Sequence, residues 1–200
     1  MSRQPDPNRR SEQSRQAILT AAAGLCAEIG YGATTVEAIA ARAGVGKQTI
    51  YRWWPSKAAV LLEHMHQARA AALSFPDTGD LRADLLEQTT ALQKLFAADI
   101  GAVWRGLIIA AQSDDAAADG VRALLEQAIE EAKARLAKGR ANGELRPDAD
   151  LDLAVEIIYG PLYHSWLLRD RPLPDGYTKE LLDLVFDGLK PAARGERARA

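Results

Sequence analysis

Residues 34–57 read TTVEAIAARAGVGKQTIYRWWPSK, and this stretch decides how the rest of the chain is interpreted. Apolar residues in its first half recur at the spacing of one helix face, up to the Ala43-Gly44 pair. A second short helix is expected over residues 47–54, and Pro55 breaks it. Two short helices joined by a tight turn are typical of a helix-turn-helix, whose second helix enters the major groove of DNA. The sequence therefore predicts a DNA-binding motif.

The start of this motif carries a helix-capping pattern, and its turn carries small residues. Thr34 and Glu37 form the T-x-x-E pattern of a capping box, which predicts that Thr34 caps the first helix. Ala40, Ala43 and Gly44 are small at the point where the two helices must approach each other.

The outer surface of the second helix carries side chains suited to base edges. Arginine pairs with guanine and glutamine with adenine, each through two hydrogen bonds. The N-terminal part of a recognition helix is the part that usually meets the bases. We therefore expect base contacts from Lys47, Gln48, Thr49 and Arg52.

Lys47 and Lys57 each stand in the first turn of a predicted helix, where a cation opposes the helix dipole at a cost of about 0.3–1 kcal/mol. A phosphate docked at the same helix end reverses the sign of this interaction. Phosphate contact is therefore favoured over the alternative, a solvated lysine. Tyr51 is expected to offer its hydroxyl to a phosphate, whereas Trp53 suits either a phosphate contact or plain packing.

Charge is distributed unevenly along the chain. The 200 residues carry a net charge of -2, but residues 1–57 hold eight Lys/Arg against four Asp/Glu, and the remainder holds seventeen against twenty-three. A basic front with a net charge of +4 and an acidic back with -6 suggest that only the front meets a polyanion. Chance fluctuation over a short segment is the alternative.

Composition indicates an ordinary globular protein, with 48% apolar and 26% charged residues. Cys26 is the single cysteine, so no intrachain disulfide forms, which suits a reducing cytosol. The chain lacks an apolar run long enough to cross a bilayer, and its first residues lack the apolar stretch of a secretion signal. These features predict a cytoplasmic protein without a membrane partner.

Nearly the whole sequence has helical patterns, which predicts an all-α fold of about nine helices. Four are expected within residues 11–73 and five near residues 80–97, 100–113, 117–141, 149–169 and 176–189. Gly160-Pro161 should kink or loosen the fourth of these five. The predicted division is a disordered arm (residues 1–10), a three-helix DNA-binding domain (11–57), a connecting helix (58–74), a C-terminal helical bundle (78–190) and a flexible tail (191–200).

The stretch GYGATTVEAIAARAGVGKQTIYRWWPSKAAVL, residues 30–61, resembles the N-terminal signature of TetR-type transcriptional regulators. The pairs Gly30-Tyr31, Thr34-Thr35 and Ser56-Lys57 fall in register, as do the segments 43–45 and 49–51. The resemblance implies a homodimer whose paired recognition helices bind a palindromic operator in double-stranded DNA. Carried over residue by residue, it implies phosphate contacts by Thr35, Tyr51, Trp53 and Lys57 and base contacts by Lys47, Gln48, Thr49 and Arg52.

One position departs from the signature. Many relatives have a serine that caps the recognition helix where this chain has Gly46. Glycine still caps acceptably, but a hydroxyl that can contact phosphate is missing.

Residues 156–189 resemble the late helices of one common TetR C-terminal subgroup, which implies ligand sensing and dimerisation. A kink beside the aromatic residues after Gly160 can open a cavity for a lipophilic or aromatic effector, although core packing is the alternative for each residue. The expected cavity lining is Trp104, Leu107, Ile108, Ile129, Tyr159, Tyr163, His164 and Trp166. The expected four-helix dimer interface is Val155, Ile158, Leu162, Leu181, Leu184, Val185 and Leu189, with intrachain core as the alternative.

Catalytic and metal-binding motifs are not found. The chain lacks G-x-S-x-G, G-x-x-x-x-G-K-[ST] and H-E-x-x-H, and His64 and His66 point apart on a helix, so neither a cofactor nor a metal is expected. The sequence predicts a dimeric repressor that a small effector releases from its operator. An activator or an effector-independent repressor of the same fold is the alternative, and a small helical enzyme is a more remote one.

Overall fold

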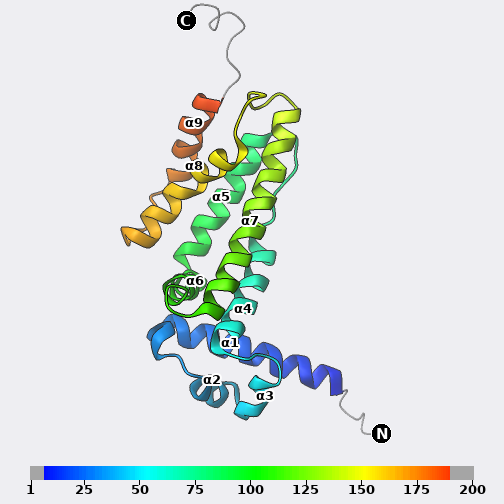
Figure 1. Ribbon diagram of the computed structural model, residues 1–200, viewed down its shortest axis with the longest axis vertical. Helices are drawn as coiled ribbons and strands as arrows, with labels where there is room; N and C mark the ends of the chain where they lie inside the picture. The colour runs from blue at the N-terminus through cyan, green and yellow to red at the C-terminus, as the bar shows by residue number, and fades with distance from the viewer. Residues whose placement is uncertain (1–6, 190–200) are drawn as a thin grey trace, which may run out of the picture. The chain divides into compact units, whose positions relative to one another are not determined.

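The computed structural model describes the backbone of residues 7–189 and the side chains of residues 11–188. Within residues 7–189 it has nine α-helices, one π-helical turn and no strand, which confirms the all-α prediction (Figure 1). The elements are α1 (Pro7–Ala33), α2 (Val36–Ala43), α3 (Lys47–Tyr51), α4 (Lys57–Ala72), α5 (Leu81–Ala97), α6 (Asp99–Ala110), α7 (Asp115–Ala141), α8 (Leu151–Tyr163), η1 (His164–Leu168) and α9 (Tyr177–Leu189).

The predicted arm and tail fall mostly outside the described residues. Residues 7–10 of the predicted arm belong to α1, so the arm prediction is wrong for them. Residues 1–6 and the predicted tail, residues 191–200, lie outside the described part of the chain.

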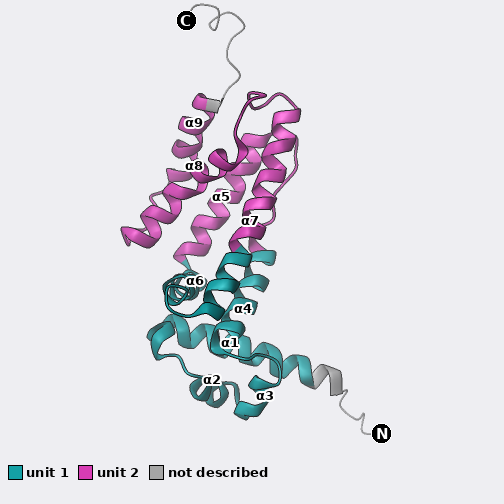
Figure 2. Cartoon of the chain, in the orientation of Figure 1, with its two compact units in different colours: residues 1–71, 98–124 teal, residues 72–97, 125–200 magenta. Residues whose placement is uncertain are grey.

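The chain divides into two compact units (Figure 2). Unit 1 comprises residues 1–71 and 98–124, and unit 2 comprises residues 72–97 and 125–200. Residues 98–124, with α6 and the start of α7, thus group with the N-terminal helices, whereas the sequence suggested one C-terminal bundle over residues 78–190. The functional boundaries at residues 57 and 78 stay a prediction.

In unit 1, α1 packs against α2 and α6. Ile18 and Leu25 are buried on the inner face of α1, whereas Ile29, one turn after Leu25, is 50% exposed. The helix breaks directly after Ile29, because Gly30 adopts φ 80°. On the facing helix, a Cβ on Gly106 would lie 2.9 Å from Cβ of Tyr31, so a glycine is needed for the close approach of α6 to the end of α1.

The cap of α2 lies one residue later than predicted. Thr35 is the N-cap, and its hydroxyl oxygen accepts a hydrogen bond from the Ala38 amide at 3.1 Å. Thr34 is fully buried and donates its hydroxyl hydrogen to the Gly30 carbonyl at 2.8 Å. The predicted capping box is therefore wrong, because the Thr34 side chain faces inward and closes the turn after α1.

The core of unit 2 is formed by apolar faces of α5, α7, α8 and α9, with Leu85, Leu136, Ile158 and Leu182 among its most buried members. The predicted helix over residues 149–169 is α8 followed by the π-helical turn η1, which the Arg169 amide closes by donating to the His164 carbonyl. Pro161 lies inside α8, and the hydrogen-bond pattern changes from α-helical to π-helical three residues after it, at His164.

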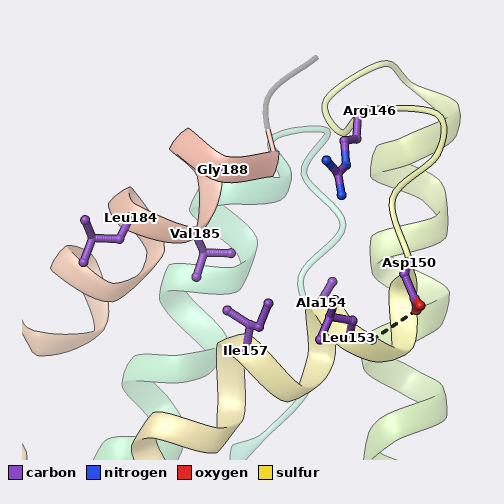
Figure 3. A pocket seen from close by; sticks show the side chains of 8 residues that line it. All are labelled: Arg146, Asp150, Leu153, Ala154, Ile157, Leu184, Val185 and Gly188. Carbon is purple, nitrogen blue, oxygen red and sulfur yellow. Dashed lines mark hydrogen bonds between the residues drawn. The ribbon is translucent and has the colours of Figure 1, made fainter. Parts of the chain in front are cut away.

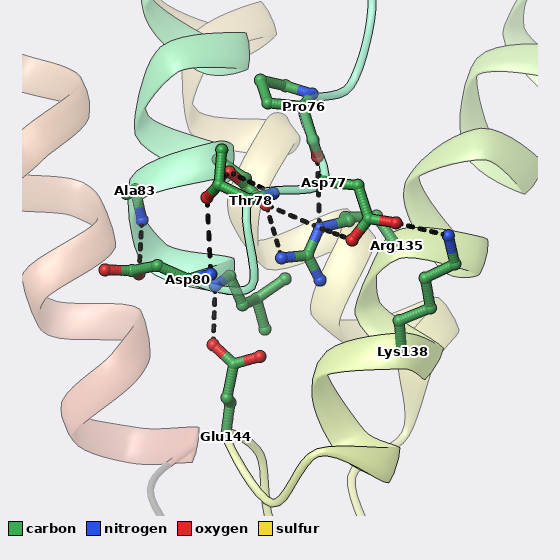
Figure 4. Close-up of polar contacts among 10 residues, drawn as sticks. Pro76, Asp77, Thr78, Asp80, Ala83, Arg135, Lys138 and Glu144 are labelled. Carbon is green, nitrogen blue, oxygen red and sulfur yellow. Dashed lines mark hydrogen bonds and ion pairs between the residues drawn. The ribbon is translucent and has the colours of Figure 1, made fainter.

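A buried ion pair between Asp84 and Arg135 joins α5 to α7, and hydrogen bonds of Pro76 and Thr78 hold the segment before α5 to this pair (Figure 4). Arg135 donates from Nε to Asp84 Oδ2 at 2.9 Å and to the Pro76 carbonyl at 3.3 Å. The Thr78 hydroxyl donates to Asp84 Oδ1 at 2.6 Å. Burial alone would raise the pKa of the Asp84 carboxyl, but the hydrogen bonds from Thr78 and Arg135 outweigh it and lower that pKa. Removing either charge would leave the other buried and unpaired.

Candidate nucleic-acid interface

The turn between α2 and α3 depends on Gly44, which adopts the left-handed conformation (φ 67°). The following Val45 amide donates to the Ala40 carbonyl at 3.0 Å, which closes the end of α2. α3 begins at Lys47 and ends at Tyr51, three residues earlier than predicted. Residues 52–54 continue in hydrogen-bonded turns, and the Trp54 amide donates to the Ile50 carbonyl at 2.9 Å.

The two faces of this segment differ sharply. Ile50 and Trp54 are buried at 0% and 4% exposure and anchor this segment to the rest of unit 1. The residues predicted to contact bases lie on the other face, with Lys47, Gln48 and Arg52 exposed and Thr49 partly exposed. A DNA duplex can therefore reach the predicted base-contacting side chains.

The predicted phosphate-contacting residues lie around the same surface. Tyr51 is 54% exposed, Thr35 is exposed at the start of α2, and Trp53 and Lys57 are partly exposed. The Thr35 hydroxyl oxygen accepts a hydrogen bond from the Ala38 amide, and the hydroxyl hydrogen of Thr35 stays available to donate.

Two cations near this surface form ion pairs. Lys47 Nζ lies 2.9 Å from Glu37 Oε1, and this hydrogen bond raises the pKa of Lys47 and lowers that of Glu37. Arg42 Nη2 lies 2.7 Å from Glu28 Oε2. Because both pairs are exposed, each costs little to break when a phosphate competes for the cation.

Lys57 makes a different set of contacts. Its ammonium group donates to the carbonyls of Tyr31 and Thr34, both at 2.7 Å, and more weakly to that of Gly32 at 3.5 Å. It also lies 4.3 Å from the centre of the Tyr31 ring. These acceptors end α1 and lead into α2, so Lys57 ties the start of α4 to that turn. A phosphate contact by Lys57 would require these hydrogen bonds to be shared or given up.

The sequence analysis did not single out Glu63, which contacts the end of the segment formed by α3 and residues 52–54. Trp54 Nε1 donates to Glu63 Oε2 at 2.8 Å, and Arg15 forms an ion pair with Glu63 Oε1. No spacing pattern relates these three residues, because they lie on separate elements. A glutamate on a largely apolar helix is the one signal that was present.

The residues predicted to line an effector cavity fall in both units. In unit 1, Trp104 and Leu107 are buried and Ile108 is half-buried on α6. In unit 2, Ile129 is 38% exposed and His164 is exposed.

The other three predicted cavity residues pack with α5 in unit 2. The ring of Trp166 stacks on Phe96 with centroids 4.1 Å apart, and Tyr163 meets Phe96 edge-on at 5.0 Å. The Tyr159 hydroxyl donates to Gln88 Oε1 at 2.8 Å, and burial raises the pKa of this phenol. The structure thus brings Tyr163 and Trp166 against Phe96, and Tyr159 against the buried side chain of Gln88, all within unit 2.

Most residues predicted at a dimer interface face the core of their own protomer. Leu181 is half-buried, Leu184 is 75% exposed, and the side chain of Leu189 lies outside the described residues. The remaining four are enclosed by their own protomer, as the alternative of intrachain core packing states, and they are Val155, Ile158, Leu162 and Val185.

An apolar surface that includes the predicted residue Leu184 is exposed on α8 and α9 (Figure 3). Leu153 and Ile157 are 49% and 42% exposed, and with Leu184 they surround a hollow of about 240 Å³. Arg146 and Asp150 stand at its edge. Leu153 and Ile157 are four residues apart, so a second apolar stripe on α8 was the sequence signal for this surface.

Comparison with known proteins identifies the family. The family model for bacterial regulatory proteins of the tetR family matches residues 18–64, and the model for the Tetracyclin repressor-like, C-terminal domain matches residues 75–185. The chain belongs to the TetR family. It is 36% identical over 188 residues to the uncharacterized HTH-type transcriptional regulator YdeS of Bacillus subtilis (strain 168), covering 94% of this chain and 95% of the relative.

A second TetR-family relative is the DNA-binding transcriptional repressor TetR of Mycobacteroides abscessus, which is 30% identical over 189 residues and covers 92% of this chain and 98% of its own. Among solved structures, the TetR family transcription regulator SCO0332 is 37% identical, with a TM-score of 0.73 and coverage of 90% of this chain and 100% of its own.

The TetR-family assignment confirms the predicted class. The protein is a DNA-binding transcriptional regulator and not an enzyme. The helix-turn-helix described above lies within the N-terminal family match. None of the helices in the described residues has the length and apolar character of a membrane span.

Proposed function

We propose that this TetR-family regulator is a cytoplasmic homodimeric repressor that binds a palindromic operator and is released by a small lipophilic or aromatic effector. The observation that carries the proposal is the outer face of α3, where Gln48 and Arg52 are exposed while Ile50 and Trp54 anchor the opposite face. The repressor named in Mycobacteroides abscessus, similar over nearly the whole chain, supports repression over activation.

The exposed polar residues are proposed to contact two kinds of group on DNA, base edges and phosphates. Gln48 and Arg52, with Lys47 and Thr49 beside them, are proposed to contact base edges. Tyr51, Thr35 and Trp53 are proposed to contact phosphates and thereby to set the register of α3 on the duplex. Lys57 is proposed to support this surface by closing the turn between α1 and α2, and to reach phosphate only secondarily.

We assign the dimer contact to the surface formed by Leu153, Ile157 and Leu184, with a second copy of this chain as its partner. An exposed apolar surface with a hollow is costly to leave in water, and covering it removes that cost. Under a two-fold axis the surface meets itself, so Arg146 of one copy can face Asp150 of the other. To bind a palindromic operator, the dimer must present its two α3 helices to half-sites about 34–36 Å apart.

The effector site is proposed in unit 2, at the aromatic cluster of Phe96, Tyr163 and Trp166. An aromatic effector could replace one ring of the stack, and the Gln88–Tyr159 pair offers a polar contact that fixes its orientation. Effector binding must favour the form unable to bind the operator, by the usual coupling of about 1–3 kcal/mol.

The alternatives are an activator and a repressor without an effector. Both share the DNA-binding surface, and they differ only in what binding does to transcription. A reporter gene placed behind the selected operator distinguishes a repressor, whose deletion raises expression, from an activator, whose deletion lowers it.

Selection of binding sites from random duplexes, followed by gel-shift titration, tests the proposed function. The expected result is a palindromic site bound at least about a thousand-fold more tightly than random DNA, with affinity that falls as salt rises. Arg52→Ala should relax the preference at one base position in each half-site. Binding without any sequence preference would refute the proposal.

Light scattering coupled to gel filtration tests the dimer. The wild type should have twice the mass of the chain, and Leu184→Glu should have the mass of one. Glu87→Gln, an exposed change on α5, is a control that should leave the mass unchanged. A wild type that is monomeric at micromolar concentration would refute the assignment of this surface.

A further inference from the structure

Glu63 joins three separate segments of unit 1 through one carboxylate. Its Oε2 accepts the indole N–H of Trp54 at 2.8 Å. Its Oε1 forms an ion pair with Arg15 on α1, and Gln67, one turn further along α4, donates to the same oxygen at 3.4 Å. The side chain is 25% exposed and that of Arg15 is 32% exposed, so water screens these interactions only in part.

The contacts continue from Trp54 to the exposed end of the recognition segment. Trp54 is 4% exposed and meets the neighbouring ring of Trp53 edge-on, with centroids 5.3 Å apart. The guanidinium carbon of Arg52 lies 5.6 Å from the centre of the Trp53 ring. A continuous set of contacts therefore runs from α4 through two indoles to a cation on the proposed base-contacting surface.

We propose that Glu63 is a positioning residue for operator recognition. It does not contact DNA itself, but its carboxylate holds the Trp54 indole, and through Trp53 this sets the position of Arg52. The inference rests on the proposed function, since it concerns how strongly one sequence is preferred over another.

The physical reason lies in the N–H group of Trp54. A buried indole N–H without an acceptor is costly, so in the absence of the carboxylate the ring must turn or admit water. Either change moves the ring that Trp53 packs against. Hydrogen bonds to base edges need accurate geometry, whereas attraction to phosphates depends mainly on charge. Loss of Glu63 should therefore weaken specific binding and leave non-specific binding nearly unchanged.

Two variants of similar size separate the acceptor from the rest of the side chain. Glu63→Met removes both oxygens, whereas Glu63→Gln keeps one oxygen that can accept the indole N–H. Both remove one negative charge. Glu12→Gln is the matched control, because Glu12 also contacts Arg15, at 3.4 Å, and its replacement changes the charge of unit 1 by the same amount.

The assay measures affinity for the selected operator and for a random duplex of the same length. Glu63→Met should bind the operator about ten-fold more weakly, as expected when the Arg52 contact to a base edge is displaced. Its affinity for random DNA should stay within about two-fold of the wild type. Glu63→Gln and Glu12→Gln should stay within about three-fold of the wild type on both duplexes.

Trp54→Phe provides an independent measurement, because it removes the N–H and keeps an aromatic ring. It should weaken operator binding by a similar factor, and combining it with Glu63→Met should add little further loss. In NMR spectra, the indole N–H resonance that Trp54→Phe removes should be shifted in Glu63→Met relative to the wild type. Should Glu63→Met fail to fold, Glu63→Asp, whose carboxylate is one methylene shorter, should show the same selective loss.

Several results would overturn the role of Glu63. These are wild-type operator affinity in a folded Glu63→Met variant, an equal loss on operator and random DNA, or fully additive losses in the double variant. They are distinct from failure of the proposed function, in which the wild type itself would not prefer any duplex over random DNA.

Discussion

Replacing Lys57 by methionine removes the ammonium group and keeps the aliphatic stem. In the folded protein this ammonium donates to the carbonyls of Tyr31 and Thr34, both at 2.7 Å, and lies 4.3 Å from the centre of the Tyr31 ring. The substitution therefore removes two short charge-assisted hydrogen bonds and a cation–π contact, and leaves backbone acceptors at the end of α1 without this donor.

The expected loss of stability follows from these contacts. Each hydrogen bond to a charged group contributes about 1.5 kcal/mol when the lower end of the range is taken for a half-buried lysine. The cation over the ring adds about 0.5–1 kcal/mol. The free energy of unfolding should fall by about 3.5–4 kcal/mol, which lowers the midpoint of thermal unfolding by roughly 7–16 °C for a chain of this length.

Lys47→Met is the matched control, because it also removes one positive charge from unit 1. Lys47 has only an exposed ion pair with Glu37, so its loss should change stability by less than about 1 kcal/mol. It should weaken operator binding, because Lys47 is proposed to contact base edges.

Thermal unfolding followed by circular dichroism, with and without operator, measures both effects. A Lys57→Met variant that unfolds at the wild-type temperature and yet loses operator affinity would refute the structural role and favour direct phosphate contact. A drop in stability as large in Lys47→Met would show that charge, and not the carbonyl contacts, is responsible.

Three further predictions concern other parts of the chain. Tyr51→Phe should weaken operator binding several-fold in a gel shift without altering the unfolding temperature. If the variant bound the operator as tightly as the wild type, the Tyr51 hydroxyl would not contact DNA. Gly106→Ala should lower stability by about 1–3 kcal/mol in chemical denaturation, because its Cβ would lie 2.9 Å from Cβ of Tyr31, and wild-type stability would mean that α6 can shift freely. The lowered pKa of Asp84 adds stability above the unfolded-state pKa of about 3.9, and this stability is lost as the pH falls toward the folded-state pKa. Asp84→Asn should therefore be less stable at neutral pH and less sensitive to acid in urea titrations between about pH 2 and 5, and a parallel acid dependence in both proteins would refute this.

Helices and their order were predictable because their signals are local. Apolar spacing, the Gly44 turn and the Pro55 break depend on neighbours within one or two turns, and α2, α3 and α4 lie close to their predicted positions. The exposed face of α3 was predictable for the same reason, since Ile50 must face inward and Gln48 and Arg52 then cannot.

The partners of individual side chains were not predictable in this way. The sequence indicates that α8 is apolar, but it does not say that Val155 and Ile158 face their own core while Leu153 and Ile157 face outward. Two apolar stripes on one helix are equivalent until a neighbouring helix covers one of them.

The sequence by itself determined the class of this protein, because a helix-turn-helix is encoded within some two dozen consecutive residues whose spacing is enough to specify it. Only the tertiary structure decided that Lys57 binds carbonyls 23 and 26 residues away and that Glu63 holds Trp54 and Arg15. The physical reason is range. Helix propensity and periodicity act over a few residues, whereas a charged group selects its partner from whatever the packed chain brings within hydrogen-bonding distance.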